Sequence, residues 1–395
     1  MQIYADNAAT TKMSDAAIEA VTECMKNYYG NPSSLYSLGQ RAKEKLEEAR
    51  AEIAELINAE TREIIFTSGG SESDNQALLS AALAGKKKGK THIISTAFEH
   101  HAILHTLKKL EKNGFEVTLL PVHENGIIRL EELSDAIRED TCLVTVMTAN
   151  NEIGTIQPIS EIGSLCREKG IWFHTDAVQA VGHLHIDVKA QNIDMLSASA
   201  HKFHGPRGTG FLYCRKGIVL SNLIEGGAQE RGKRAGTENL PAIMGMAAAL
   251  KEAVRDMDKV NEHKQKVRDH LIRGLKEIPH SAVNGDEVQR LSGNVNFSFE
   301  GIEGESLLIL LDKKGISASS GSACTSGALD PSHVLLSIGR VHDVAHGSLR
   351  LTIGEDITIE EADYIIENVK EIVEYLRSFS PVWRDLMTGK RQFIL

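Results

Sequence analysis

A lysine within a compact polar segment is the residue of this 395-residue chain with the most readily named chemistry. Lys202 lies in SASAHKFHGPRGTG, residues 197–210, beside Ser199, His201 and several glycines. A lone lysine in a loop is usually only solvated, but these surroundings are unlike an ordinary exposed stretch. Because lysine amines form Schiff bases with carbonyl groups, Lys202 is a candidate for holding a carbonyl-bearing cofactor.

A carboxylate upstream of Lys202 suits the ring of such a cofactor. Asp176 lies in WFHTDAVQAVG, at the carboxyl end of a predicted buried strand, where ligand clefts form in open α/β sheets. A protonated pyridine nitrogen would be a suitable partner, and Gln179 could bond a ring oxygen. A helix-capping aspartate is the alternative, and it is the more ordinary one for Asp176 alone.

A glycine-rich turn supplies a place for an anion. In FTSGGSESDNQALL, residues 66–79, a predicted strand ends and a helix begins. Gly69 and Gly70 let backbone N–H groups approach a ligand at the helix N-terminus, and Ser71 with Asp74 fits a capping box. Phosphate binding and a plain tight turn explain this segment equally well.

Two further segments contain residues that could bind an aromatic ring and a carboxylate. His100 and His101 follow the predicted strand HIIS and cannot share one helix face, so one of them could stack on an aromatic ring. A helix-cap histidine is the alternative. Arg350 lies on a predicted strand among apolar residues, and such an arginine needs a carboxylate from either a structural side chain or a substrate.

Of the five cysteines, one has the surroundings of a reactive thiol. Cys324 lies in ISASSGSACTSGALDPSH, residues 316–333, where small polar neighbours predict a loop and a reactive thiol. The odd number and the lack of any CxxC pair argue against a disulfide framework or a zinc site and favour a reducing cytoplasm. The other four are interpreted as packing residues, namely Cys24, Cys142, Cys166 and Cys214.

The elements that must position these groups alternate between strand and helix over the first ~240 residues. Short strands with apolar residues on both faces predict an α/β fold with a largely parallel sheet. A long helical stretch from 240 to 278 leads to a smaller α+β unit, with strands predicted over 294–299 and 347–352. We expect a large domain over 15–255 and a small domain over 256–395 that also includes the N-terminal segment 1–14.

Composition excludes some classes of function. The net charge of −10 and the pI of about 5.9 argue against direct nucleic-acid binding. No stretch approaches the ~20 apolar residues that a membrane helix needs, and the first residues do not resemble a secretory signal. The expected protein is cytoplasmic, without a membrane partner.

The order and spacing of these segments are more specific than any one of them. The chain resembles the cysteine desulfurases of the Nif/Isc type, which are class V aminotransferase-like enzymes of the fold-type I pyridoxal-phosphate (PLP) group. The resemblance is carried by DNAATT, GNPSS, TSGGSESDN, EHHA, NNEIG, HTDAVQ, SAHKFHGPRG, ERGKRAGTEN, SSGSACTSG and HGSLR. It implies a mainly parallel seven-stranded sheet in the large domain, with the cysteine loop in the small domain.

The resemblance also implies a role for each matching residue. PLP would be held by Lys202, with His100 stacked on its ring, Asp176 at its pyridine nitrogen and Gln179 at its phenolic oxygen. The substrate L-cysteine would be bound through its carboxylate by Asn151, which also lies at the cofactor, and by Arg350. The phosphate would be held by Gly70, Ser71, Ser199 and His201, with Thr237 from the second subunit of a homodimer.

The implied reaction gives L-alanine and a persulfide on Cys324, with Lys202 and His100 as proton carriers. The sulfur would pass to an acceptor protein for iron–sulfur cluster assembly or for tRNA and cofactor thiolation. No resident metal is expected, although Cys324 could transiently contact a cluster on a scaffold. Selenocysteine lyase, a transaminase and a cofactor-bearing partner without turnover are the alternatives, and the last two differ from a desulfurase in what they make from cysteine.

Overall fold

A seven-stranded sheet forms the centre of the computed structural model, which describes residues 2–320 and 331–395. The strand order is β2-β8-β7-β6-β5-β3-β4, and neighbours are parallel except that β8 is antiparallel to β2 and β7. The strands are β2 (Ile64–Thr67), β3 (His92–Thr96), β4 (Glu116–Leu120), β5 (Thr141–Thr145), β6 (Trp172–Asp176), β7 (Met195–Ser199) and β8 (Gly210–Cys214). The predicted largely parallel α/β sheet is confirmed.

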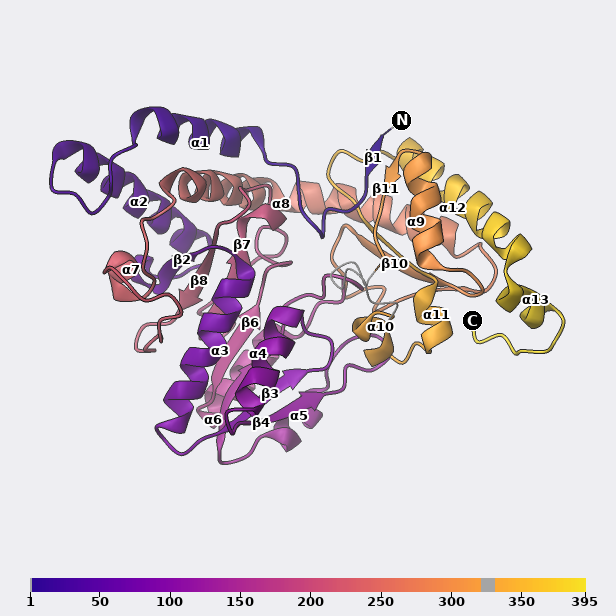
Figure 1. Ribbon diagram of the computed structural model, residues 1–395, viewed down its shortest axis with the longest axis horizontal. Coiled ribbons are helices and arrows are strands. Elements are labelled where there is room, and N and C mark those ends of the chain that lie inside the picture. Colours follow the sequence, from indigo (N-terminus) through magenta and orange to yellow (C-terminus); the bar gives the residue numbers. More distant parts are fainter. Residues whose placement is uncertain (1, 321–330) are drawn as a thin grey trace.

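Helices cover both faces of this sheet, which explains the apolar character of its strands (Figure 1). Ile64 and Ile65 are adjacent in β2, so they point to opposite faces, and each belongs to a different hydrophobic cluster. Both are almost completely buried. The helices of this part are α1 (Asp15–Asn27), α2 (Ser37–Leu56), α3 (Gly70–Lys86), α4 (His101–Glu111), α5 (Leu130–Ala136), α6 (Ile159–Lys169) and α7 (Gln229–Gly232).

A second, smaller unit has its own core at the other end of the molecule (Figure 1). Its sheet has the order β12-β10-β9, with β9 (Ser281–Val283), β10 (Asn294–Phe299) and β12 (Ser348–Thr352). The sequence predicts the last two of these strands but not β9. The helices are α9 (Gly304–Lys313), α10 (His333–Ser337), α11 (His342–His346), α12 (Ile359–Phe379) and α13 (Pro381–Met387).

Two segments connect the two units. The long helix α8 (Leu240–Leu275) runs from one to the other, and the predicted boundary at residue 255 lies inside it (Figure 1). The N-terminal strand β1 (Ile3–Tyr4) pairs with β11 (Ile316–Ser317), and Thr11 then donates its backbone N–H to the His201 carbonyl. The division into 15–255 and 256–395 with 1–14 stays a prediction.

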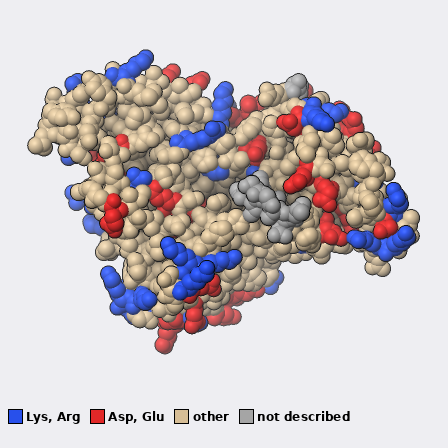
Figure 2. Space-filling view, in the orientation of Figure 1, with Lys and Arg blue, Asp and Glu red and all other residues tan. Residues whose placement is uncertain are grey.

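The surface carries charges of both signs. Figure 2 shows acidic and basic side chains interspersed on one face, with an extended neutral area over α1 and α2. Within the described part of the chain, no helix is long and apolar enough to cross a bilayer. Among the same residues, no group of three or more His, Cys, Asp or Glu side chains is arranged to hold a metal ion.

Candidate active site

A cleft at the N-terminus of α3 brings together the four residues predicted to hold a phosphate. Its volume is about 330 Å³, and its lining includes Gly70, Ser71, Ser199 and His201. Gly70 lies so close to the neighbouring chain that a Cβ there would come within 2.4 Å of the Val178 side chain. The cleft therefore combines a helix N-terminus, hydroxyl groups and a closely approaching backbone, which suits a phosphate group.

The start of α3 differs from the predicted capping box. The helix begins at Gly70 and is capped by Gly69, which has a φ of +147° and makes no side-chain capping bond. Ser71 is therefore inside the first turn with its hydroxyl at the cleft, and Asp74 is buried below it. The prediction was wrong because the glycines allow the strand to turn directly into the helix without a capping side chain.

Lys202 reaches across to the N-terminal segment. Its Nζ donates to the carbonyl oxygens of Ala8 and Ala9 at 2.5 and 2.9 Å. Its own carbonyl accepts a hydrogen bond from Nε2 of the half-buried His183 at 2.8 Å. Both the amine and the backbone carbonyl of Lys202 are thereby held, and the preceding residue, His201, lines the phosphate-binding cleft.

Asp176 lies at the end of β6, close to Lys202 and His100. Burial raises the pKa of its carboxyl group, while the charges of His100 and Lys202 and the Val178 N–H act in the opposite direction. A neighbouring buried carboxyl group is that of Asp74, whose pKa is raised well above its usual range by burial and by the charge of Asp176. We expect Asp74 to keep its proton and Asp176 to carry the negative charge, because the cations face Asp176.

The predicted ring-binding residues have ordinary structural contacts as well. His100 is the N-cap of α4, and its Nδ1 accepts the Ala102 N–H at 3.1 Å, which is the alternative that the sequence left open. Gln179 donates from Nε2 to the Ala8 carbonyl at 3.0 Å, the same oxygen that Lys202 contacts. Both residues are thus held next to Asp176 and Lys202.

Arg350 is buried on β12 and already has a structural carboxylate. Its Nη2 donates to Asp6 at 2.8 Å and its Nη1 to the backbone carbonyl of Asn151 at 3.1 Å. Its Nε is buried without a hydrogen-bond partner among the described residues. The guanidinium group therefore lies beside the Asn151 backbone and retains a free donor at Nε among the described residues, while its pairing with Asn151 to bind a carboxylate stays a prediction.

Two predicted residues stand apart from this cluster. Thr237 lines a neighbouring cleft together with Ser68 and Gly208, which also border the phosphate-binding cleft. Whether it serves the second subunit's site stays a prediction. Cys324 lies outside the described residues.

The remaining four cysteines are all buried, which confirms them as packing residues. Burial raises the pKa of the thiols of Cys24 and Cys142 to about 11. It raises those of Cys166 and Cys214 to about 12. Since the thiolate is the nucleophile, these four thiols are unreactive at neutral pH.

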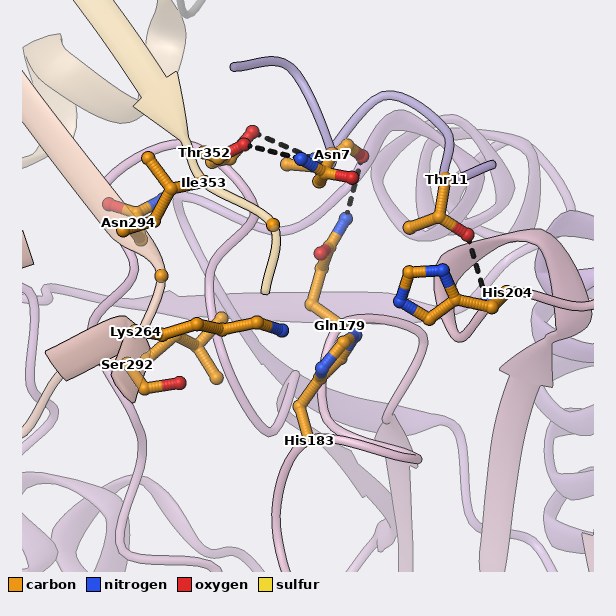
Figure 3. A pocket seen from close by; sticks show the side chains of 14 residues that line it. Asn7, Thr11, Gln179, His183, His204, Lys264, Ser292, Asn294, Thr352 and Ile353 are labelled. Atoms are coloured by element: carbon orange, nitrogen blue, oxygen red, sulfur yellow. Dashed lines mark hydrogen bonds between the residues drawn. The ribbon is translucent and has the colours of Figure 1, made fainter. Parts of the chain in front are cut away.

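A second cavity lies at the junction of the two units. Its lining includes Gln179, His183, His204 and Lys264, and Figure 3 shows the Lys264 amine directed into it toward His183 and Gln179. Burial, together with the positive charge of Lys264, lowers the pKa of His183 to about 3. The His183 ring is therefore neutral and donates only from Nε2, toward Lys202.

Sequence reasoning missed several groups that shape this site. The Ala8 and Ala9 carbonyls carry no side-chain signature, so no pattern could identify them as partners of Lys202. Asp6 was part of the DNAATT motif, but only its distance from Arg350 shows what it contacts. Glu152, in NNEIG, was also passed over, although a buried acid within a polar motif is a signal in itself.

Comparisons with known proteins show the family to which the chain is similar. The class-V aminotransferase family matches residues 3–365. A cysteine desulfurase IscS from Clostridium botulinum is 53% identical, with 99% of each chain covered. One from Methanosarcina thermophila is also 53% identical, covering 96% of this chain and 94% of its own.

Solved structures show the same likeness. A NifS-like protein superposes with a TM-score of 0.89 at 37% identity, covering 95% of this chain and 100% of its own. SspA in complex with cysteine superposes with a TM-score of 0.79 at 35% identity, covering 90% and 99%. The chain belongs to the class-V aminotransferase family, within the cysteine desulfurases of the Nif/Isc type.

Proposed function

We propose that this chain transfers the sulfur of L-cysteine to Cys324, giving L-alanine and a persulfide. As a cysteine desulfurase it is a PLP-dependent enzyme. The observation that carries the proposal is the single site that unites a phosphate cleft, the Lys202 amine and the buried Asp176. SspA, a relative with the same fold, is described in complex with cysteine.

The residues present fit PLP. The cleft at the start of α3 would hold its phosphate through Gly70, Ser71, Ser199 and His201, and Lys202 would hold its carbonyl carbon. Burial and the charges of Lys202 and Arg207 lower the pKa of His201 to about 4, so this ring is neutral until an anion lies beside it. Asp176 would face the ring nitrogen, with Gln179 and Asn151 at the ring and His100 over it.

The chain's own groups handle protons and orientation. PLP supplies an electron-withdrawing ring next to the substrate Cα. The Lys202 amine, once the substrate amine has replaced it at the cofactor's carbonyl carbon, would take the Cα proton. Asp176 keeps the ring nitrogen protonated through its negative charge, and Arg350 with Asn151 holds the substrate carboxylate so that Cα faces Lys202.

Cys324 carries out the sulfur transfer. Its thiolate attacks the substrate sulfur, so an S–S bond forms as the Cβ–S bond breaks, and the bonding electrons stay with the substrate carbon. That carbon then takes a proton, for which His100 is the proposed donor. The products, L-alanine and the Cys324 persulfide, together contain all atoms of cysteine and the thiol.

The proposal extends to partners and location. Exposed apolar side chains gather where α1 leads into α2, with Tyr29, Leu35 and Tyr36 exposed by 73, 95 and 58%. Such a patch supports a homodimer, in which Thr237 serves the second site. An acceptor protein for iron–sulfur assembly or thiolation would then take the sulfur. The four cysteines of the described residues form no disulfide, which supports a cytoplasmic location.

Two variants test the function. Lys202→Ala should abolish both alanine formation and the absorbance of the bound cofactor. Cys324→Ala should keep that absorbance but lower alanine and sulfide formation from L-cysteine by about 10²-fold or more, because the persulfide cannot form. The assay measures alanine and sulfide together, with a thiol reductant and with or without a 2-oxo acid.

Cys166→Ala is the matched control, because it removes an equally small but buried thiol and should retain the wild-type rate. Alanine formed by Cys324→Ala at the wild-type rate would contradict sulfur transfer to Cys324. Consumption of the 2-oxo acid in step with cysteine would instead indicate a transaminase.

A further inference from the structure

A buried glutamate beside Arg350 has no part in the reaction described above. Glu152 is 5% exposed and follows Asn151 in the NNEIG turn. Its carboxyl group accepts a short hydrogen bond from the Ser332 hydroxyl, and Ser332 is the N-cap of α10. Its backbone carbonyl accepts hydrogen bonds from Asn294 and Asn296 on β10, both at 3.0 Å.

These contacts place Glu152 between two units of the fold. The turn that carries it is fixed from within, because Asn150 Oδ1 accepts the Glu152 N–H at 2.8 Å. If the Glu152 side chain moved away, the buried Ser332 hydroxyl would lose its hydrogen-bond acceptor. The same hydroxyl caps α10 by accepting the N–H groups of Val334 and Leu335. Glu152 is thus a fixed group rather than a surface acid that happens to lie close by.

Arg350 is the positive charge next to Glu152, because its Nη1 donates to the backbone carbonyl of the preceding residue, Asn151, at 3.1 Å. Burial raises the pKa of Glu152 to about 7, while the Ser332 hydrogen bond and the Arg350 charge act to lower it. Arg350 also contacts Asp6, so this guanidinium group already balances one full negative charge before any substrate carboxylate arrives. A substrate carboxylate would bring a second negative charge to Arg350, and an ionised Glu152 would be a third.

We propose that Glu152 is a positioning residue that takes up a proton when a carboxylate pairs with Arg350, and that Ser332 connects this change to the start of α10. The proposal rests on the proposed placement of the substrate carboxylate at Arg350. A neutral Glu152 keeps its hydrogen bond from Ser332 but no longer competes for the positive charge. Removing that competition directs Arg350 toward the substrate.

The direction of the linkage follows from the charges. A carboxylate on Arg350 offsets the positive charge that lowers the pKa of Glu152, so this pKa rises on binding and a proton is taken up. By the same linkage, a carboxylate should bind more weakly as pH rises above about 7, where the free protein holds Glu152 ionised.

The probe is propionate, which has a carboxylate but neither the amine nor the thiol that would add their own titrations. Its competitive inhibition constant against L-cysteine is measured on the holoenzyme from about pH 6 to about pH 9. In the wild type this constant should rise by up to about tenfold, as expected for a pKa change of about one unit on binding. In Glu152→Gln the rise should disappear.

Two other variants make the test specific. Ser332→Ala removes a hydrogen bond that lowers the pKa of Glu152, so the rise should move to higher pH by up to about one unit. This readout holds even if Glu152→Gln folds poorly, which thermal unfolding would reveal. Glu168→Gln, an exposed glutamate on α6, is the matched control and should keep the wild-type profile.

Arg350→Leu separates this inference from the proposed function. If propionate inhibits that variant as well as the wild type, the carboxylate does not bind at Arg350, and the proposed substrate placement is wrong. If Arg350→Leu abolishes inhibition while Glu152→Gln keeps the wild-type pH profile, only the role of Glu152 is overturned.

Discussion

Two buried carboxyl groups, Asp74 and Asp176, lie under the proposed ring site and are expected to differ in charge. The raised pKa of Asp74, caused by burial and by Asp176, keeps it protonated, so Asp74→Asn replaces a neutral group by a neutral one of the same shape. Asp176→Asn instead removes the negative charge that faces His100 and Lys202. We expect turnover to fall by about 10²-fold or more in Asp176→Asn and by less than about threefold in Asp74→Asn.

The two variants control each other, because both exchange a buried aspartate for asparagine. Turnover and the absorbance of bound PLP are measured for each. An equal loss in both variants would show that the charge is shared rather than held by Asp176.

For individual residues, side-chain types in the sequence predicted which residues would lie together at the site. They did not predict which partners hold each side chain in place. Gly70, Ser71, Ser199 and His201 were predicted as one set and do line one cleft. The Ala8 carbonyl holds Lys202 and Gln179, yet nothing in a sequence distinguishes one carbonyl from another.

At the scale of elements, a buried ion pair fixes the segment that carries Thr237. Glu230 accepts hydrogen bonds from both Nη atoms of Arg50 on α2, at 2.6 and 2.7 Å, and from the Phe66 N–H of β2. Glu230→Gln leaves the buried Arg50 charge with only the exposed Glu47 as an ionic partner, so we expect the free energy of unfolding to fall by about 3–5 kcal/mol. Chemical denaturation measures this change.

The exposed pair of Lys45 and Glu48 is the matched control, because Glu48→Gln makes the same substitution in an ion pair at 2.6 Å. Solvent screens that pair, and the change should be below about 1 kcal/mol. A similar effect of both substitutions would mean that burial does not decide the strength of the Glu230 pair.

The elements themselves were predictable where apolar periodicity was strong. The strand over 294–299 was predicted to the residue, and the long helix from Leu240 ends at Leu275, a few residues before the expected end. The short strands β1, β9 and β11 were not predicted, because two or three residues carry no period and depend on a partner distant in sequence.

At the scale of the whole molecule, the two units meet around a cavity with a lysine that is 6% exposed, Lys264 on α8 (Figure 3). Burial lowers the pKa of its amine, against the weaker opposing effect of Glu355 and Asp356. A charge that is unfavourable in the folded state destabilises it, so Lys264→Met should raise the free energy of unfolding by about 1–3 kcal/mol at neutral pH. Chemical denaturation of the holoenzyme measures the gain.

The pH dependence of that gain identifies its cause. The pKa of Lys264 in the folded state is below that of an exposed lysine. The destabilisation that its buried charge causes is therefore complete at any pH where the amine is charged in both the folded and the unfolded state. As pH rises through the lowered folded-state pKa, the folded protein loses the proton first, and the advantage of Lys264→Met should shrink toward zero. Lys251→Met, on the exposed side of α8, is the control and should show no such trend. A gain in Lys264→Met that stays constant with pH would come from better packing at the junction rather than from the removed charge.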